Sequence, residues 1–209
     1  MIKQKSTGRS YKVVFLGENK VGKTSIITRY FYNTFSEKTE VTVCDFCKYK
    51  TIQTKNGSIE LAVWDTAGQE KYHALAPIYY RKADAAIIVY NITVQQTFQN
   101  VRLWIQELQQ FSQNANIIPV IVGNKDDLHM HRAVEQSQVD ELCNQYNAKH
   151  FQVSAKSDKG ITEIFDYIAD GKQTYVRLEL IKSVKQPNET TNFQEGNKKQ
   201  TQKEGGRYC

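Results

Sequence analysis

The amino-acid sequence predicts an α/β domain in which helices connect the strands of a parallel sheet. Short continuous apolar runs at 85–90 and 117–122 are typical of strands that are covered on both faces. The segment between these runs, 98–111, carries apolar residues at helical spacing. Because strands and helices alternate in this way, parallel pairing with helical crossovers is favoured. A length of 209 residues is enough for one such domain with a sizeable core.

The other elements are predicted from the same signals of apolar runs, alternation and helical stripes. In chain order we expect a strand at 11–16, a helix at 25–31, a loop at 33–43, strands at 47–52, 59–64 and 85–90, a helix at 98–111, a strand at 117–122, a helix at 134–146, a strand at 149–153 and a helix at 161–180. Asn56-Gly57 separates the second and third strands and is the strongest short signal for a hairpin. From about residue 183 onward apolar residues almost vanish, so we expect disorder there.

A glycine-rich loop, Gly17–Thr24, joins the first strand to the first helix in the pattern G-x-x-x-x-G-K-T. Gly17 and Gly22 permit backbone conformations that turn successive N–H groups inward, and the N-terminus of the following helix adds partial positive charge. The pattern therefore predicts a phosphate-binding loop. Lys23 would reach the β- and γ-phosphates of a nucleotide, and the Thr24 hydroxyl would bind Mg²⁺. The alternative interpretation is a glycine turn followed by an incidental Gly-Lys-Thr.

A second polar segment, Asp65-Thr66-Ala67-Gly68-Gln69, follows the strand at 59–64. Open parallel sheets bind their ligands at the carboxyl ends of the strands, so this segment should lie beside the glycine-rich loop. Asp65 would hold the Mg²⁺ shell, Gly68 would offer its N–H to the γ-phosphate, and Gln69 would orient an attacking water. The two segments together predict hydrolysis of a nucleoside triphosphate.

A third polar segment, Asn124-Lys125-Asp126-Asp127, follows the strand at 117–122, and Ser154-Ala155-Lys156 follows the last strand. The carboxylate of Asp127 can accept two parallel hydrogen bonds, from the N1–H and the exocyclic amine of guanine. Adenine has an acceptor at that ring nitrogen and no amine beside it, so the same carboxylate would reject it. The segment therefore predicts specificity for guanine.

The net charge of +6 is concentrated at the two ends of the chain. Residues 1–10 carry three Lys and Arg and no acid, and residues 182–209 carry six Lys and Arg against three Glu. A nucleic-acid binder would instead show a basic stripe on its folded domain, so a membrane surface is the favoured partner and nucleic acid is not expected. Four cysteines at irregular spacing make no disulfide framework, which favours a reducing, cytosolic setting.

The motifs G-x-x-x-x-G-K-T, D-T-A-G-Q-E, N-K-D-D and S-A-K, in this order and spacing, resemble those of the Ras superfamily of small GTPases. Trp64-Asp65 and the run 72–81 are similar to the Rab branch, and His73 with the following Ala-Pro-Ile resembles its early-endosomal group, Rab five, twenty-one and twenty-two. The resemblance covers about 11–176. It implies a P-loop NTPase fold, a small G domain at 11–180 with a six-stranded, mostly parallel sheet flanked by five helices. A flexible basic N-terminus at 1–10 and a disordered hypervariable tail at 181–209 would flank that domain.

By the same resemblance the protein would bind GTP or GDP with Mg²⁺ and hydrolyse GTP slowly, with Gln69 and Lys23 as its catalytic residues. The residues implied in nucleotide binding are Gly17, Asn19, Lys20, Val21, Gly22, Lys23, Thr24, Ser25, Phe35, Thr42, Gly68, Asn124, Lys125, Asp127, Ser154, Ala155 and Lys156. Mg²⁺ would be held by Thr24, Thr42 and Asp65. Thr42 would cap the γ-phosphate only in the GTP state, and Phe35 would pack edge-on against the guanine.

The resemblance also implies a monomer that regulates vesicle traffic and interacts with a defined set of partner proteins. These are a guanine-nucleotide exchange factor, a GTPase-activating protein that supplies the arginine missing from the site, a GDP-dissociation inhibitor, and effectors that touch Trp64 and Tyr79. A lipid on Cys209 would hold the protein on the cytosolic face of endosomal membranes. Cys209 has no second cysteine beside it and no C-a-a-X signal, so we expect a single prenyl group and weak attachment.

Two departures from the family pattern leave alternatives open. Asn19 stands where relatives have a small residue: its side chain either crowds Gln69 and slows hydrolysis or turns outward without effect. Slow hydrolysis would favour a second hypothesis, a non-hydrolysing GTP-binding module that acts only by recruiting effectors. The aromatic position that contacts effectors is filled either by Cys47, in an ungapped register, or by Phe46 after a local slip. Separately, His129, His131 and His150 lie in loop or strand-edge contexts without the spacing of metal ligands, and we expect them to face solvent.

Overall fold

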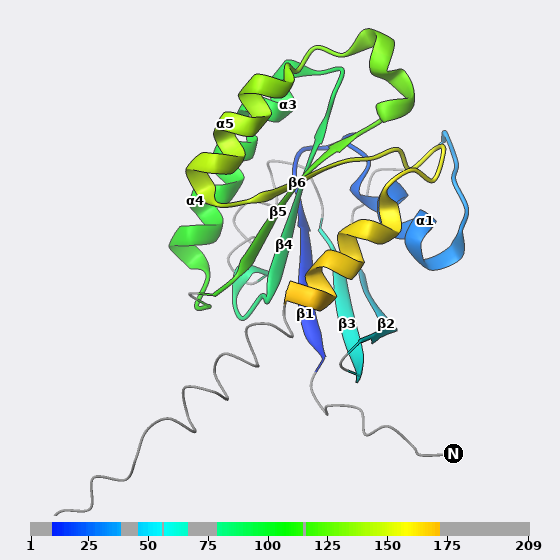
Figure 1. Ribbon diagram of the computed structural model, residues 1–209, viewed down its shortest axis with the longest axis vertical. Helices are drawn as coiled ribbons and strands as arrows, with labels where there is room; N and C mark the ends of the chain where they lie inside the picture. The colour runs from blue at the N-terminus through cyan, green and yellow to red at the C-terminus, as the bar shows by residue number, and fades with distance from the viewer. Residues whose placement is uncertain (1–9, 39–45, 56, 67–78, 115, 172–209) are drawn as a thin grey trace, which may run out of the picture.

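A computed structural model describes residues 10–38, 46–55, 57–66, 79–114 and 116–171. Residues 1–9, 39–45, 56, 67–78, 115 and 172–209 lie outside the described residues and are drawn in grey in Figure 1. Expectations for Thr42, Gly68, Gln69 and Cys209, and for the tail at 181–209, therefore fall outside the described part of the chain. Within that part, none of the helices combines the length and apolar character needed to cross a membrane.

One six-stranded sheet, in the order β2-β3-β1-β4-β5-β6, forms the centre of the domain (Figure 1). The strands are β1 (Tyr11–Leu16), β2 (Phe46–Thr54), β3 (Gly57–Asp65), β4 (Ala85–Asn91), β5 (Ile118–Asn124) and β6 (Lys149–Gln152). All neighbouring pairs are parallel except β2 with β3. The prediction of a six-stranded, mostly parallel sheet is confirmed.

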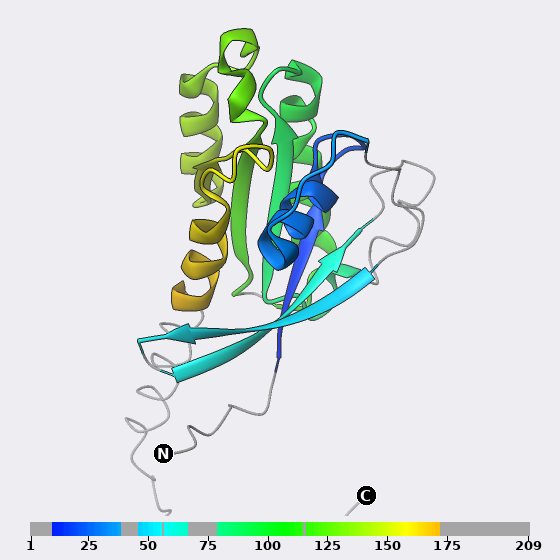
Figure 2. The ribbon, with the colours of Figure 1, turned by 90° about the vertical axis from the view of Figure 1, so that its right-hand side faces the viewer.

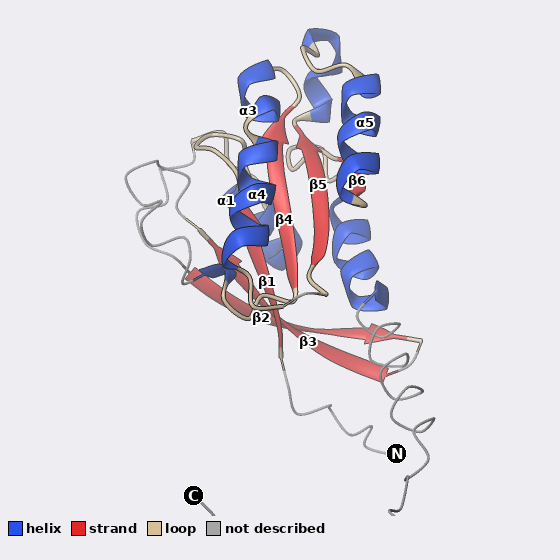
Figure 3. Ribbon diagram, turned by 90° about the vertical axis from the view of Figure 1, so that its left-hand side faces the viewer, coloured by secondary structure: helices blue, strands red, loops and turns tan. Residues whose placement is uncertain are grey.

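Helices cover both faces of the sheet because side chains alternate between the faces along each buried strand. In β1, Val13 and Phe15 belong to one core cluster, whereas Val14 and Leu16 belong to the other. The first cluster includes side chains from α1 (Lys23–Tyr32) and from the helix at 161–171. The second includes side chains from α3 (Gln95–Gln99), α4 (Val101–Phe111) and α5 (Gln136–Tyr146). Figure 3 shows α4 in front of β4 and α5 beside β5.

The hairpin predicted at Asn56-Gly57 is confirmed, since β2 and β3 pair antiparallel from Phe46↔Asp65 to Thr54↔Gly57. Figure 2 shows this hairpin extending beyond the rest of the sheet. Its register places Cys47 opposite Trp64, and residues directly opposite each other in an antiparallel pair have their side chains on the same face. The structure thus has the ungapped register, in which Cys47 and not Phe46 lies beside Trp64.

The helix predicted at 98–111 is interrupted at Asn100, which the apolar spacing did not reveal. Asn100 ends α3 and precedes α4, and its side-chain amide contacts the carboxylate of Glu18 in the glycine-rich loop. Leu103, an apolar residue within this predicted helix, is exposed on the outer face of α4. A short 3-10 helix at Asp126–His131 was not predicted either. It follows directly on Lys125, whose backbone is left-handed (φ 69°).

Candidate functional site

The glycine-rich loop leads from β1 into α1 at the carboxyl edge of the sheet (Figure 1). Gly17 and Gly22 both have positive φ, 129° and 98°, a region that side chains disfavour. A Cβ atom on Gly17 would collide with the Val89 carbonyl oxygen, and one on Gly22 would collide with the Asn124 amide. Backbone rather than side chains therefore forms these two turns of the loop, as a phosphate-binding loop requires.

Lys23 begins α1 and holds its ammonium group across the loop. Its Nζ donates to the carbonyl oxygens of Gly17 at 2.8 Å and Glu18 at 3.0 Å, and the residue is 6% exposed. Burial lowers the pKa of Lys23 to about 8, although the carboxylates of Asp65 and Glu18 act in the opposite direction. A phosphate group beside this amine would supply the negative charge that the buried cation lacks.

Asp65 lies next to the same loop because β1 and β3 are parallel neighbours with Phe15 opposite Asp65. The residue is 4% exposed, and the following Thr66 donates its hydroxyl to the Phe15 carbonyl oxygen at 2.5 Å. Thr24 lies in the first turn of α1. A carboxylate and a hydroxyl oxygen are ligands that Mg²⁺ accepts, so Asp65 and Thr24 fit the expected ion, while Thr42 lies outside the described residues.

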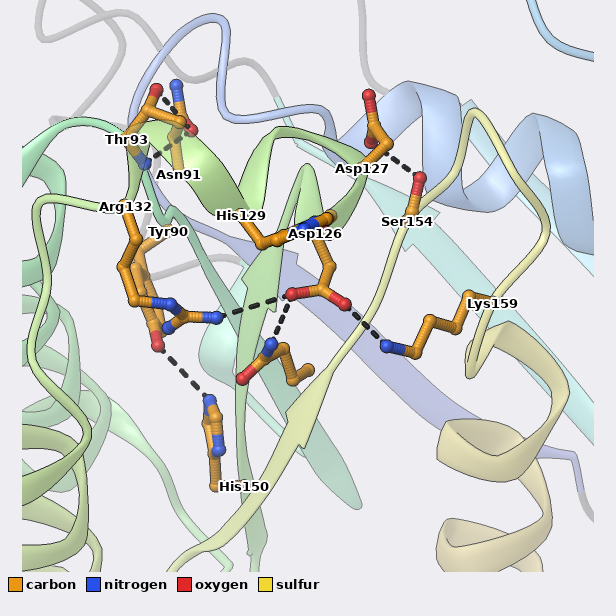
Figure 4. A network of polar contacts seen from close by, with 11 residues as sticks. Tyr90, Asn91, Thr93, Asp126, Asp127, His129, Arg132, His150, Ser154 and Lys159 are labelled. Carbon is orange, nitrogen blue, oxygen red and sulfur yellow. Dashed lines mark hydrogen bonds and ion pairs between the residues drawn. The ribbon is translucent and has the colours of Figure 1, made fainter.

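Asn124, at the end of β5, connects three loops that are far apart in the sequence. Its Nδ2 donates to the Val21 carbonyl oxygen at 2.9 Å, and its Oδ1 accepts the backbone N–H of Ala155 at 3.2 Å. The residue is 2% exposed. Nearby, the Ser154 hydroxyl donates to Asp127 Oδ1 at 2.6 Å (Figure 4). The segments predicted to bind phosphate and base are therefore brought together at one edge of the sheet.

Arg29 is a site residue that sequence reasoning missed. From α1 its Nε donates to the Ala155 carbonyl oxygen at 2.9 Å and its Nη2 to the Lys156 carbonyl oxygen at 3.1 Å. Its Nη1 also donates to the carbonyl oxygen of Asn33, just past the helix end. The guanidinium thus fastens the loop after β6 to α1. Arginine in a surface helix is common, so no local signal distinguished this one.

The other predicted nucleotide-binding residues lie around these loops. The Asn19 side chain turns back on its own loop and accepts the Lys20 backbone N–H at 2.8 Å. Gln69, which Asn19 is expected either to crowd or to leave free, lies outside the described residues. Val21 is buried in the first core cluster, and Phe35 is half-buried against it. Ser25, in α1, and Lys125 are half-buried as well. Lys156 is exposed, with its Nζ 2.8 Å from Glu37 Oε1.

Trp64 and Tyr79, the predicted effector-contact residues, are both half-buried, so each residue is partly exposed at the surface. Their ring centroids lie 6.2 Å apart. The ammonium of Lys12 lies over the Trp64 ring, 4.8 Å from its centroid, and burial is the main cause of the lowered pKa of Lys12. The attraction between this cation and the face of the indole ring favours the observed position of the ring.

The expectation that His150 faces solvent is wrong. Its ring is stacked near Tyr90, with Nε2 3.1 Å from the Tyr90 hydroxyl (Figure 4). Burial lowers the pKa of His150 to about 4, so the ring is neutral at physiological pH. The error arose because β6 is the last strand of the sheet, and an edge strand is usually more open than this one, which α5 partly covers.

Comparisons with known proteins agree with the geometry of the site. The family model described as the Ras family matches residues 12–173. Human Ras-related protein Rab-21 is 45% identical over 156 residues, which cover 75% of this chain and 69% of that protein. Ras-related protein Rab-21 of Dictyostelium discoideum is 43% identical over 159 residues (76% and 74%), and Ras-related protein RabC of the same organism is 36% identical over 160 residues (76% and 81%).

The matched region contains the glycine-rich loop, the segment that begins at Asp65, the Asn124–Asp127 segment and the loop at 154–156. Both the family match and the identities extend over most of the chain. Ras-family proteins are GTP-hydrolysing switches that bind guanine nucleotide and Mg²⁺. This chain therefore belongs to the Ras family, as a small GTPase of the Rab branch that is similar to Rab-21.

Proposed function

We propose that this protein is a GTP-dependent switch that regulates vesicle traffic from the cytosolic face of endosomal membranes. The observation that carries the proposal is the contact of Asn124 with both Val21 and Ala155, because it brings the phosphate loop and the base-reading loops to a single site. The similarity to Rab-21 supports an early-endosomal role. Exchange factor, activating protein, GDP-dissociation inhibitor and effectors are its proposed partners, as for Rab proteins in general.

In this proposal guanine is read by Asp127, whose carboxylate accepts from N1–H and the exocyclic amine. The Ser154 hydroxyl, 2.6 Å from Asp127 Oδ1, orients that carboxylate. Asn124 and Lys125 brace the base, and Phe35 packs edge-on against it. The backbone of Ala155 offers an N–H near the base, although in this structure that N–H is donated to Asn124.

The phosphates are bound by the backbone N–H groups of the loop from Gly17 to Ser25 and by the Lys23 ammonium. Lys23 exchanges its two carbonyl acceptors, 2.8 and 3.0 Å away, for phosphate oxygens. Thr24 and Asp65, with Thr42, hold Mg²⁺, which when bound neutralises negative charge on the phosphates. Gln69 orients the attacking water, and Lys23 stabilises the charge that develops on the transferred group.

Switching follows from the contacts that the γ-phosphate makes. Thr42 and Gly68 bind the γ-phosphate in the GTP state, and its loss on hydrolysis releases the segments that carry them. Effectors then lose a surface that includes Trp64 and Tyr79. A GTP-binding module without hydrolysis, the second hypothesis, is not favoured because Ras-family proteins hydrolyse GTP.

Membrane attachment is proposed to occur through a single prenyl group on Cys209. One lipid chain gives only marginal, reversible binding. The basic residues near the C-terminus add about 1 kcal/mol each at an anionic surface, so attachment should depend on salt. Mass spectrometry of the C-terminal peptide from membrane-bound protein tests this, and an unmodified Cys209 would show that another group anchors the protein.

Base recognition is tested by Asp127→Asn. An amide at this position offers a donor to the carbonyl of xanthine, so the variant should lose affinity for GDP and gain affinity for XDP. Titration of both nucleotides against the wild-type protein measures the change. An unchanged preference for GDP would overturn the assignment of Asp127.

The switch itself is tested in cells with two tagged variants. Thr24→Asn should disturb the Mg²⁺ site and favour the GDP-bound or empty protein in the cytosol. Gln69→Leu should hold the GTP state and increase the endosomal fraction. If both variants distribute as the wild-type protein does, nucleotide state does not control membrane association and the proposed switch fails.

A further inference from the structure

Asp126 precedes the base-reading Asp127, but its side chain lies in a separate cluster below the site (Figure 4). Its Oδ1 accepts hydrogen bonds from Arg132 Nη2 at 3.2 Å and from Gln152 Nε2, and its Oδ2 accepts one from Lys159 Nζ at 2.6 Å. These partners come from the end of the 3-10 helix, from β6 and from the turn after β6. One carboxylate thus joins three segments around the candidate base site.

The Asp126 carboxylate is ionised although it is only 5% exposed. Burial acts to raise the pKa of Asp126, but the hydrogen bonds from Lys159 and Gln152 and the positive charges of Lys159 and Arg132 outweigh it and hold the pKa below the ordinary value. Arg132 depends on the same carboxylate, because its Nη1 is buried without an acceptor among the described residues. A buried anion with this many donors favours a single arrangement of the segments that supply them.

A closed circuit of contacts links Asp126 to Asp127. Lys159, which binds Asp126 through its side chain, also pairs with Ser154 through its backbone: each N–H donates to the other's carbonyl oxygen, at 3.0 and 3.1 Å. Ser154 in turn donates its hydroxyl to Asp127 Oδ1 at 2.6 Å. The Asp126 carboxylate is thus connected, through Lys159, to the hydroxyl that contacts Asp127.

We propose that Asp126 is a positioning residue for guanine recognition, which acts through Lys159 and Ser154 to place the Asp127 carboxylate and so slows nucleotide release. The inference rests on the proposed role of Asp127. It assigns to Asp126 a contribution to specificity as well as to stability. The Lys159 side chain is 63% exposed, so its loss should affect release with little effect on folding.

The test compares release of fluorescent GDP and IDP from the full-length protein. Hypoxanthine lacks the exocyclic amine, so IDP makes one of the two hydrogen bonds to Asp127 that GDP makes. Asp126→Asn should speed GDP release about tenfold or more, because removing one member of a buried ion pair disturbs the remaining charges. It should speed IDP release by clearly less, because IDP makes only one of the two hydrogen bonds to Asp127. Lys159→Met should shift both rates in the same direction by a smaller factor, and Lys159→Arg should restore them.

Asp140→Asn is the matched control. It removes the same charge from the exposed face of α5, where Gln136 Nε2 donates a hydrogen bond to the Asp140 carboxylate at 2.8 Å. Its GDP and IDP release rates should equal those of the wild-type protein. A combination of Asp126→Asn with Ser154→Ala should speed GDP release by less than the product of the two single effects, because both act through Asp127.

Equal acceleration of GDP and IDP release in Asp126→Asn, with multiplicative effects in the double variant, would overturn the proposal and leave Asp126 a structural residue. Wild-type release rates in Lys159→Met would also overturn it. Asp127→Asn separates this failure from that of the proposed function. If Asp127→Asn changes the base preference while Asp126→Asn leaves the GDP to IDP ratio unchanged, base reading by Asp127 stands and only the role of Asp126 is lost.

Discussion

The Asn124 side chain donates a hydrogen bond to the Val21 carbonyl oxygen at 2.9 Å, although the two residues are 103 positions apart. Val21 lies in the loop after β1 and Asn124 at the end of β5, with β4 between these strands. A side chain on the neighbouring Gly22 would collide with the same amide. The contact therefore requires both an asparagine at the end of β5 and a glycine in the loop.

Replacing Asn124 with Ala should weaken nucleotide retention. The Val21 carbonyl and the Ala155 N–H would each lose a buried partner, at a cost of about 2 kcal/mol in total, which corresponds to roughly thirtyfold faster GDP release. Stopped-flow release of a fluorescent GDP measures the rate. Asn116→Ala, on an exposed residue before β5, serves as the control and should release GDP at the wild-type rate. Equal rates in both variants would contradict this role of Asn124.

Gln69→Leu should lower the rate of GTP hydrolysis while leaving GTP affinity nearly unchanged, because the side chain is expected to contact water and not the nucleotide. Asn19→Gly should raise the rate if Asn19 crowds Gln69, and it also frees the Lys20 N–H that the Asn19 side chain accepts at 2.8 Å. Single-turnover phosphate release measures the hydrolysis rate of the wild-type protein and of both variants. Identical rates would refute both the role of Gln69 and the effect of Asn19.

Trp64→Ala should weaken binding of an effector domain without changing GDP affinity. The ring is half-buried beside Tyr79 and under the Lys12 ammonium, and none of these three residues belongs to the loops that would bind nucleotide. Calorimetric titration of the GTP-loaded protein with an effector domain of a Rab-21 relative provides the measurement. Tyr167→Ala, on an exposed ring of the helix at 161–171, is the control. Loss of GDP affinity in Trp64→Ala would show that the ring is structural.

The stability of the folded protein should fall as the pH is lowered from 6.5 towards 4. The pKa of a histidine in the unfolded chain is 6.5, and burial lowers the pKa of His150 to about 4 in the folded state. Between these values the unfolded chain binds a proton at His150 that the folded protein does not, so acid favours unfolding by an amount on the order of 3 kcal/mol at pH 4.

His150→Gln removes this titration while keeping a polar side chain near the Tyr90 hydroxyl. Its unfolding midpoint should therefore depend less on pH between 6.5 and 4 than that of the wild-type protein. Thermal unfolding followed by circular dichroism at several pH values measures both slopes. Parallel slopes would mean that other groups cause the acid sensitivity.

The sequence by itself determined the class of fold and the positions of the nucleotide-binding segments. Apolar runs and alternation are local patterns, and they located β1, β4 and β5 to within a few residues. The glycine spacing at Gly17 and Gly22 is also local, because it reflects the backbone conformation of one loop. Parallel strands bring their carboxyl ends to one edge, so the meeting of the loops followed from the fold class.

Only the tertiary structure decided how these segments are held together. Arg29 reaches the Ala155 carbonyl across 126 positions, and Asp126 reaches Lys159 across 33. The break at Asn100 accompanies a contact with Glu18, and the neutral state of His150 depends on burial near Tyr90. Such contacts join single side chains from distant segments and have no period along the chain, because their partners become neighbours only once the sheet has formed.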